Sequence, residues 1–378
     1  MRATVERSHL LRSLSHVHRV VERRNTIPIL SNVLIRAEGG RMTLKATDLD
    51  LEVTETVAAD VGQGGATTVP AHILHDIVRK LPDGAEVSLD TGDGQQLSLK
   101  SGRSRFTLQI LPEADFPDLT TGEFPTRFQL PAGTLKKLID RTQFAISTEE
   151  TRYYLNGIYL HAVTVGKKPM LRAVATDGHR LAQAQFDAPA GSEKMTGVIV
   201  PRKAVGEIQK LVETGGDTPV DIEISDTKIR VTIPASAGAS DVVLTSKLID
   251  GTFPDYARVI PQNNEKILKV DRGAFADAVD RVSTISSERG RAVKVALADG
   301  KMTLSVNNPD SGSATEEVAV DYEGDDIEIG FNSRYLLDVA GQLETKTAEF
   351  RLADPGSPTL ILDDGAADAL YVLMPMRV

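Results

Sequence analysis

The sequence predicts an α+β fold built from three copies of one domain. The apolar residues Val69, Ile199 and Ile329 occupy matching positions 130 residues apart. Each third of the chain also repeats the same order of helix, strands, second helix and further strands. Alternating runs joined by tight turns, such as "AEVSLDTGDGQQLSLKSGRSRFTLQI", predict antiparallel sheets. A chain of 378 residues has room for several domains of ordinary size.

An amphipathic helix is expected at the start of each third. In "HLLRSLSHVHRVV" the apolar residues recur three and four positions apart, which is the spacing of one helix face. The same spacing occurs in "TLKKLIDRTQF" and "AFADAVDRVSTI". We therefore predict helices at residues 8–24, 134–142 and 272–282.

A strand and a second helix follow in each third. The segments are "TTVPAHILHDIVRKL", "VIVPRKAVGEIQKLV" and "IEIGFNSRYLLDVAGQL", which predict helices at residues 71–81, 202–212 and 333–343. The first two repeats close on similar proline-bearing loops, "ADFPDL" and "GTFPDY". We place the domains at residues 1–125, 126–257 and 258–378.

The composition is that of a globular protein, with 41% hydrophobic and 25% charged residues. The absence of cysteine excludes disulfides and thiolate zinc sites. No apolar run is long enough for a membrane helix and the N-terminus lacks the apolar region of a signal peptide, so a cytoplasmic protein without a membrane partner is expected. Taken alone, a net charge of −10 argues against a nucleic-acid partner.

The predicted helices have a different charge from the rest of the chain. They contain fifteen Lys and Arg against seven Asp and Glu, a net charge of +8, which leaves −18 for the remainder. Because the apolar stripe of each helix faces a core, the basic residues lie on the solvated side. This pattern is compatible with ordinary helix surface, or with a basic surface suited to the phosphate backbone of nucleic acid.

The sequence contains few candidates for catalysis. Asp177 and His179 in "ATDGHRLA" have the residue types for acid–base chemistry, so a DNA-directed hydrolase remains an alternative to a binding protein. No serine elbow, phosphate-binding glycine loop or metal motif accompanies them. His72 and His75 have helical spacing, but a metal would need further ligands. We expect no cofactor, no metal site and no catalytic residue.

Nine short motifs occur in the order in which they are found in one known family. They are "TIPILSNVLI" (26–35), "TDLDLEV" (47–53), "SGRSRF" (101–106), "RYYLNGIYL" (152–160), "ATDGHRLA" (175–182), "VPRK" (200–203), "FPDY" (253–256), "IGFN" (329–332) and "MPMR" (374–377). Over essentially its whole length the chain resembles the bacterial DNA polymerase III β subunits, the replicative sliding clamps.

The resemblance implies a DNA-clamp fold in a head-to-tail homodimeric ring. Antiparallel sheets would lie outside and the helices would line a central hole through which duplex DNA passes, without regard to sequence. The implied function is to tether the replicative polymerase and other DNA-processing proteins to DNA, with no reaction of its own. The implied partners are the DNA polymerase III alpha subunit, the clamp loader, and other polymerases and repair proteins that carry short linear motifs. A non-encircling DNA-binding protein remains the alternative.

By position, the resemblance implies DNA contacts at Arg24, Tyr153 and Tyr154. Arg24 can bind phosphate, and the tyrosines can stack on bases or support their loop. As an alternative, the tyrosines would be strand residues that pack a sheet. Glu149 and Glu150, next to them, depart from the neutral residues expected in the family.

The resemblance also implies a subunit interface and a partner-peptide pocket. A head-to-tail interface needs two different complementary patches. For the interface the residues are Arg103, Arg105, Phe106 and Leu108 in the first domain, with Ile285 and Glu316 in the third. For the pocket they are Leu155, Thr176, Gly178, His179, Arg180, Leu181, Pro254, Val259, Val372, Met374, Pro375, Met376 and Arg377. Adaptable methionines suit a site that receives several partners, and we expect the apolar tail to complete the third domain's sheet.

Overall fold

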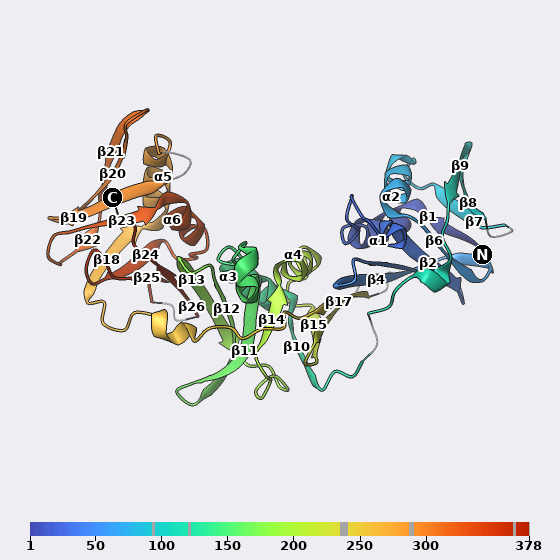
Figure 1. Ribbon diagram of the computed structural model, residues 1–378, viewed down its shortest axis with the longest axis horizontal. Helices are drawn as coiled ribbons and strands as arrows, with labels where there is room; N and C mark the ends of the chain where they lie inside the picture. Colours follow the sequence, from blue (N-terminus) through green and yellow to red (C-terminus); the bar gives the residue numbers. More distant parts are fainter. Residues whose placement is uncertain (93–94, 120–121, 235–240, 287–290, 366–367, 378) are drawn as a thin grey trace. The chain divides into compact units, whose positions relative to one another are not determined.

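The computed structural model describes residues 1–92, 95–119, 122–234, 241–286, 291–365 and 368–377, and the chain divides into two compact units (Figure 1). Unit 1 comprises residues 1–136, 189–192 and 203–248. Unit 2 comprises residues 137–188, 193–202 and 249–378.

All six predicted helices are present. Their bounds are α1 Arg7–Val17, α2 Ala71–Lys80, α3 Ala132–Gln143, α4 Arg202–Leu211, α5 Arg272–Ser283 and α6 Ser333–Ala340. Short 3₁₀ helices lie at η1 Pro28–Ser31, η2 Glu113–Asp115, η3 Glu150–Leu155 and η4 Tyr256–Val259. In each repeat one strand precedes the first helix and one strand leads directly into the second, which confirms the threefold repeat read from the sequence.

Helix α1 is shorter than predicted, because it ends at Val17 and not at residue 24. Val20 donates its backbone N–H to Val17 O and Val21 donates to His18 O, so the helix gives way to tight turns. Both valines are nonetheless buried. Because Val20 and Val21 are buried, their spacing in the sequence resembled the apolar face of a longer helix. Arg24, which was predicted to lie on that helix, lies in a loop.

Unit 1 contains two antiparallel sheets. The five-stranded sheet has the order β5-β1-β7-β8-β9, and the eight-stranded sheet has the order β10-β15-β16-β17-β4-β3-β2-β6. Pairing of β17 with β4 makes one continuous sheet from strands of the first and second repeats. The strands are β1 Arg2–Glu6, β2 Asn32–Glu38, β3 Arg41–Thr47, β4 Leu51–Ala58, β5 Asp60–Gln63, β6 Gly65–Pro70, β7 Glu86–Asp90, β8 Gln96–Ser101, β9 Ser104–Gln109, β10 Thr126–Pro131, β15 Pro219–Ile224, β16 Lys228–Ile233 and β17 Val242–Lys247.

Unit 2 has the same plan. Its nine-stranded sheet has the order β14-β11-β12-β13-β26-β25-β24-β18-β22, and its four-stranded sheet has the order β21-β20-β19-β23. Here the pairing of β13 with β26 joins the second and third repeats. The strands are β11 Gly157–Val165, β12 Lys168–Thr176, β13 Arg180–Asp187, β14 Val198–Pro201, β18 Lys266–Asp271, β19 Ala292–Ala298, β20 Lys301–Asn308, β21 Gly312–Ala319, β22 Asp321–Tyr322, β23 Ile327–Asn332, β24 Thr347–Leu352, β25 Thr359–Asp363 and β26 Ala369–Leu373.

The core lies between the helices and the sheets within each unit. Helix α1 packs on α2 and on β4 in unit 1, and α5 packs on α6 and on β21 in unit 2. Val69, Ile199 and Ile329 lie on the strands that lead into the second helices and are almost completely buried. Each repeat therefore uses the same position to anchor its second helix to a sheet.

Candidate functional sites

The C-terminal tail is held in place by backbone hydrogen bonds. Its strand β26 lies between β25 and β13, with Leu181 opposite Val372. Beyond the strand, Met374 donates its N–H to His179 O at 2.9 Å and Met376 donates to Gly330 O at 2.8 Å. The tail thus completes the third domain's sheet, as expected, and also joins it to the second repeat. Val378 lies outside the described residues.

The predicted pocket residues Leu155, Leu181 and Val372 meet in one buried apolar cluster of unit 2. Phe253 and Tyr256 belong to the same cluster. Residues far apart in the sequence are therefore brought together beneath one surface. We call the surface formed by the 176–181 turn, the 253–259 segment and the 372–377 tail the tail site.

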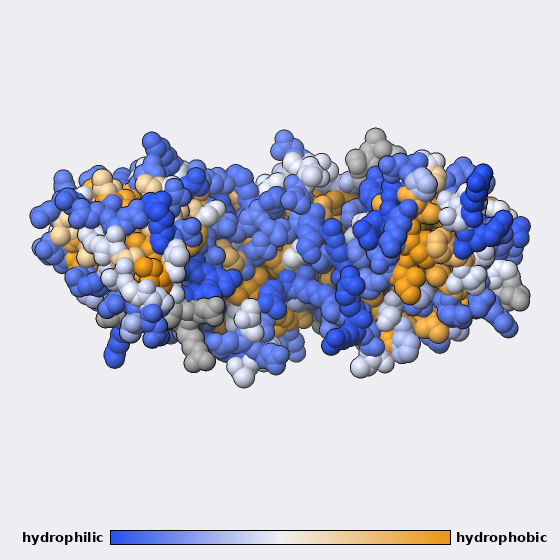
Figure 2. All heavy atoms as spheres, turned by 90° about the horizontal axis from the view of Figure 1, so that it is seen from above, coloured by the Kyte–Doolittle hydropathy of each residue, from blue (hydrophilic) through white to orange (hydrophobic). Residues whose placement is uncertain are grey.

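Two predicted residues of the tail site are unusually exposed for apolar side chains. Val259 is 47% exposed and Met374 is 40% exposed. Hydrophilic residues cover most of the face seen in Figure 2, with hydrophobic residues in separate patches between them. Exposed apolar side chains mark a protein-binding surface where they form one contiguous patch.

The turn between β12 and β13 is shaped by its own side chains. Thr176 donates its hydroxyl to Arg180 O at 2.7 Å and accepts from Gly178 N at 3.1 Å. Gly178 has a φ of +88°, a region that favours glycine. A Cβ at this position would lie 2.5 Å from Nη1 of Arg152. Glycine therefore meets two requirements here, the backbone conformation and the close approach of Arg152.

Asp177 and His179 do not form an acid–base pair within the described residues. The Asp177 carboxylate accepts from the backbone N–H groups of His179 and Arg180, at 2.9 and 3.0 Å, and from Nε of Arg180 at 3.0 Å. These bonds explain Asp177 as the residue that closes the turn. His179 is exposed, and its link to Asp177 is through its backbone.

Arg180 lies in the predicted pocket, but its charged group is directed to the protein. All three guanidinium nitrogens donate hydrogen bonds: Nε to Asp177, Nη1 to Asp338 at 2.6 Å and Nη2 to Phe144 O at 2.6 Å. The guanidinium carbon lies 4.1 Å from the ring centre of Tyr335 and 5.1 Å from that of Phe144. The contacts of Arg180 with Asp338 and Tyr335 could not be predicted from the sequence.

The remaining tail-site residues lie at its edges. Pro254 is exposed and its carbonyl accepts from Tyr256 N at 2.7 Å, while Pro375 is half-buried. Met376 and Arg377 line an open cavity of about 880 Å³ against one face of the four-stranded sheet. Arg377 is exposed and forms no ion pair with the residues that the structure describes.

Arg24 is one of several exposed cations in unit 1. It follows α1 in a loop together with Arg23, and Lys80 ends α2. None of the three forms an ion pair within the described part of the chain. Many other helix cations are paired, as Lys203 is with Asp48. These three exposed cations are available to a phosphate, as are others of unit 1, such as Arg41 on β3 and Arg105 on β9.

The two predicted DNA-contact tyrosines differ in their surroundings. They lie in the 3₁₀ helix η3, so their alternative description as strand residues is wrong. Tyr153 is 54% exposed, whereas Tyr154 is half-buried and packs on the apolar cluster of the tail site. Glu149 is paired with Arg152 at 2.6 Å, which offsets one of the two negative charges beside them.

The predicted interface residues lie at two open sheet edges. Arg103 precedes β9, and Arg105, Phe106 and Leu108 lie on it; β9 is an edge strand of the five-stranded sheet. Arg105 is exposed, Phe106 is half-buried and Leu108 is nearly buried.

The matching edge in unit 2 is β21, an outer strand of the four-stranded sheet, which carries Glu316. Arg281 of α5 donates two hydrogen bonds to Glu316, at 2.6 and 3.0 Å, and these lower the pKa of that carboxyl. Half-buried Ile285 follows α5, and its carbonyl accepts from Asn308 Nδ2 at 2.9 Å. The pairing of Glu316 with Arg281 was not predicted from the sequence.

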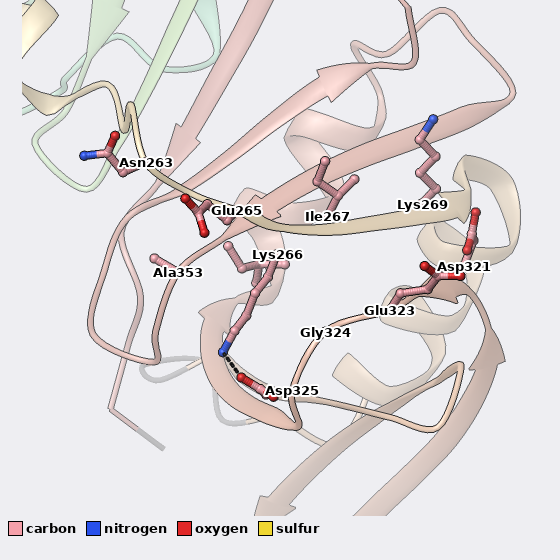
Figure 3. Close-up of a pocket in the computed structure, with 11 residues that line it drawn as sticks. Asn263, Glu265, Lys266, Ile267, Lys269, Asp321, Glu323, Gly324, Asp325 and Ala353 are labelled. Atoms are coloured by element: carbon pink, nitrogen blue, oxygen red, sulfur yellow. Dashed lines mark ion pairs between the residues drawn. The ribbon is translucent and has the colours of Figure 1, made fainter.

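A further cavity contains none of the predicted residues. The open cavity of about 730 Å³ beside β18 is lined by Lys266, Ile267 and Lys269 on one side and by Asp321 and the 323–325 loop on the other (Figure 3). Lys266 lies 3.9 Å from Asp325 there. No cluster of three metal-binding side chains occurs within the described ranges. In the same part of the chain, no helix has the length and apolar character to cross a membrane.

Models of one known protein family match nearly every residue of the chain. Models of the DNA polymerase III beta subunit match residues 1–120 as the N-terminal domain, 129–255 as the central domain and 257–377 as the C-terminal domain. The chain belongs to the bacterial DNA polymerase III beta subunit family.

Individual relatives of this family are similar over their whole length. A beta sliding clamp of Caulobacter vibrioides is 54% identical over 379 residues, and that of Escherichia coli K12 is 41% identical over 380 residues, each covering 100% of both chains. The crystal structure of a sliding clamp from Bartonella birtlesii bound to griselimycin is 58% identical, covers 100% of both chains and superposes with a TM-score of 0.96.

Membership in this family establishes the broad function. The chain is a sliding clamp of DNA polymerase III, a processivity factor without a catalytic activity of its own. The α+β clamp fold with three repeated domains, predicted from the sequence, is confirmed. The site residues and the domain limits 1–125, 126–257 and 258–378 stay predictions.

Proposed function

We propose that two copies of this chain form a head-to-tail ring around duplex DNA. The observation that carries the proposal is the pair of open edge strands, β9 and β21. Unpaired edges readily add a further antiparallel strand. A head-to-tail contact requires two different surfaces, and a basic edge with Arg103 and Arg105 is complementary to an acidic edge with Glu316 and Glu317.

The arginines of β9 would meet an acidic edge that is already partly neutralised, because Arg281 binds Glu316. Phe106 and Leu108 on β9, with Ile285 beyond α5, would supply apolar contact at the same interface. The interface would therefore depend on strand pairing and apolar burial as well as on charge.

DNA would be held loosely inside the ring. Arg24, with Arg23 and Lys80, offers exposed cations for the phosphate backbone, and Tyr153 offers an exposed ring for stacking. Contacts of this kind are weak at physiological salt, so the ring can slide while closure prevents its escape. The acidic remainder of the chain would disfavour DNA outside the hole.

The tail site would receive the partners. Short apolar segments of the DNA polymerase III alpha subunit, of the clamp loader and of other polymerases and repair proteins would pack on Leu155, Leu181 and Val372 between Val259 and Met374. Griselimycin, which the Bartonella birtlesii clamp binds, is proposed as a ligand of this chain as well. A protein with these partners works in the cytoplasm.

Removal of residues 374–378 tests the tail site. Because β26 ends at Leu373, the deletion should leave the dimer intact and abolish binding of a peptide derived from the polymerase alpha subunit. Size-exclusion chromatography with light scattering checks the dimer, and calorimetry measures the peptide affinity. An intact dimer with unchanged peptide affinity would contradict the assignment.

A further inference from the structure

Arg180 is better placed to hold the tail site together than to contact a partner. Its side chain is 10% exposed, and each guanidinium nitrogen already donates a hydrogen bond to the protein. The planar group also lies over the rings of Tyr335 and Phe144. A partner could bind this guanidinium only by displacing contacts that satisfy its charge in a nearly buried position.

The contacts of Arg180 join four segments of unit 2. Its backbone and side chain hold the 176–180 turn through Asp177, and its strand position opposite Leu373 holds the end of β26. Nη1 reaches Asp338 on α6, and Nη2 reaches the carbonyl of Phe144, which follows α3. The adjacent residue, His179, accepts the backbone N–H of Met374.

We infer that Arg180 is a positioning residue of the tail site and that Asp338, which lies on α6 outside this site, sets partner affinity through it. Asp338 fixes the guanidinium, the guanidinium fixes the 176–180 turn, and the turn fixes Met374 through His179 O. Without the Asp338 carboxylate the guanidinium loses a charge-assisted bond and can move away from the two aromatic rings. The inference rests on the proposed partner function of the tail site.

Asp338 differs in its contacts from other acidic residues on the helices of unit 2. Asp277 on α5 is exposed and has no hydrogen bond or ion pair to the tail site among the described residues. Asp338→Asn and Asp277→Asn make the same chemical change on neighbouring helices. They form a matched pair of variants, because only Asp338→Asn removes a contact in the series that leads to Met374.

The test uses the full-length protein and griselimycin as the probe, with affinity measured by calorimetry well below the unfolding temperature. Asp338→Asn should weaken griselimycin binding about tenfold, while Asp277→Asn leaves it unchanged. In a double-mutant cycle, Asp338→Asn should add little to Arg180→Gln, because both remove the same link. Compared with Arg180→Gln, Arg180→Lys should restore only part of the griselimycin affinity, because a lysine makes a single-point contact where arginine makes several.

The outcomes separate this inference from the proposed function. If deletion of residues 374–378 weakens griselimycin binding but Asp338→Asn binds as the wild type does, the positioning role is wrong and the tail site stands. Additive effects of Arg180→Gln and Asp338→Asn would also overturn it, as they would show independent actions. If the deletion leaves griselimycin affinity unchanged, the tail site itself is misassigned. A variant that loses thermal stability without losing affinity would show a purely structural role for Asp338.

Discussion

Gly178 illustrates how single residues shape the tail site. Its φ of +88° suits glycine, and the space that a side chain would fill is occupied by Nη1 of Arg152. The family resemblance named Gly178 only as a pocket residue, and the structure identifies Arg152 as its close neighbour. That neighbour is itself fixed by an ion pair with Glu149.

We expect Gly178→Ala to lower both stability and partner affinity. A Cβ in left-handed backbone costs about 1–2 kcal/mol, and here it also displaces Arg152. Gly166→Ala is the matched control, because Gly166 has a φ of +64° in the β11–β12 turn with nothing within 4 Å of the added Cβ. Thermal unfolding should show a loss for both variants, whereas calorimetry should show weaker griselimycin binding for Gly178→Ala alone. Equal affinities of the two variants would contradict the role of this turn.

Residue roles were predictable to different degrees. Leu155, Leu181 and Val372 were named from the family resemblance, and the structure packs them into one cluster. Asp338 had no signal in the sequence, because one acid on a polar helix face looks like any other. Its contact with Arg180 depends on how α6 lies against β13, which local sequence does not encode.

At the scale of elements, α1 and α2 share a histidine cluster. The rings of His18 and His75 stack at 3.9 Å, and His72 lies edge-on to His18 at 5.6 Å. His72 also bonds Val21 O at 2.9 Å and so holds the loop that carries Arg24. These contacts hold the turns that follow α1 against α2.

Because of this cluster, we expect the free energy of unfolding to fall at mildly acidic pH. Burial lowers the pKa of His18 and of His75 below the ordinary 6.5. The Leu14 carbonyl raises the pKa of His18 and Asp76 raises that of His75, each by less than burial lowers it, and the positive charges of Arg19 and Arg79 add smaller effects in the direction of burial. The unfolded chain therefore binds more protons than the folded one. The contribution of the two neutral histidines to the free energy of unfolding is fully present above pH 6.5. It is lost as the pH falls through the lowered pKa values of the folded protein.

Denaturant unfolding of the wild type and His75→Phe at several pH values measures this effect. The phenylalanine keeps a stacked ring without a titrating group, so the free energy of unfolding should depend less on pH between neutrality and pH 5. Substitution of exposed Ile73 on α2 by Phe serves as the control, because it removes no titrating group, and should leave the pH dependence as it is in the wild type. An equal slope for His75→Phe and the wild type would contradict the assignment.

At the scale of the whole molecule, the repeat was the part best predicted from the sequence. Periodicity and the 130-residue spacing identified six helices, and each lies where a repeat requires it. The joining of repeats by β4–β17 and β13–β26 was not predictable, because strand partners from different repeats share no local signal. The open edges β9 and β21 likewise became visible only with the sheet order.

Closure of the proposed ring, and not affinity, would keep this protein on DNA. The most direct measurement is retention on closed circular DNA after loading by a clamp loader, followed by a salt wash and cutting of the circle. We predict that retention survives the salt wash and is lost when the circle is cut, and that an Arg105→Glu variant on the β9 edge is retained poorly. Loss on salt alone, with equal retention on circular and linear DNA, would contradict the ring and support a non-encircling DNA-binding protein.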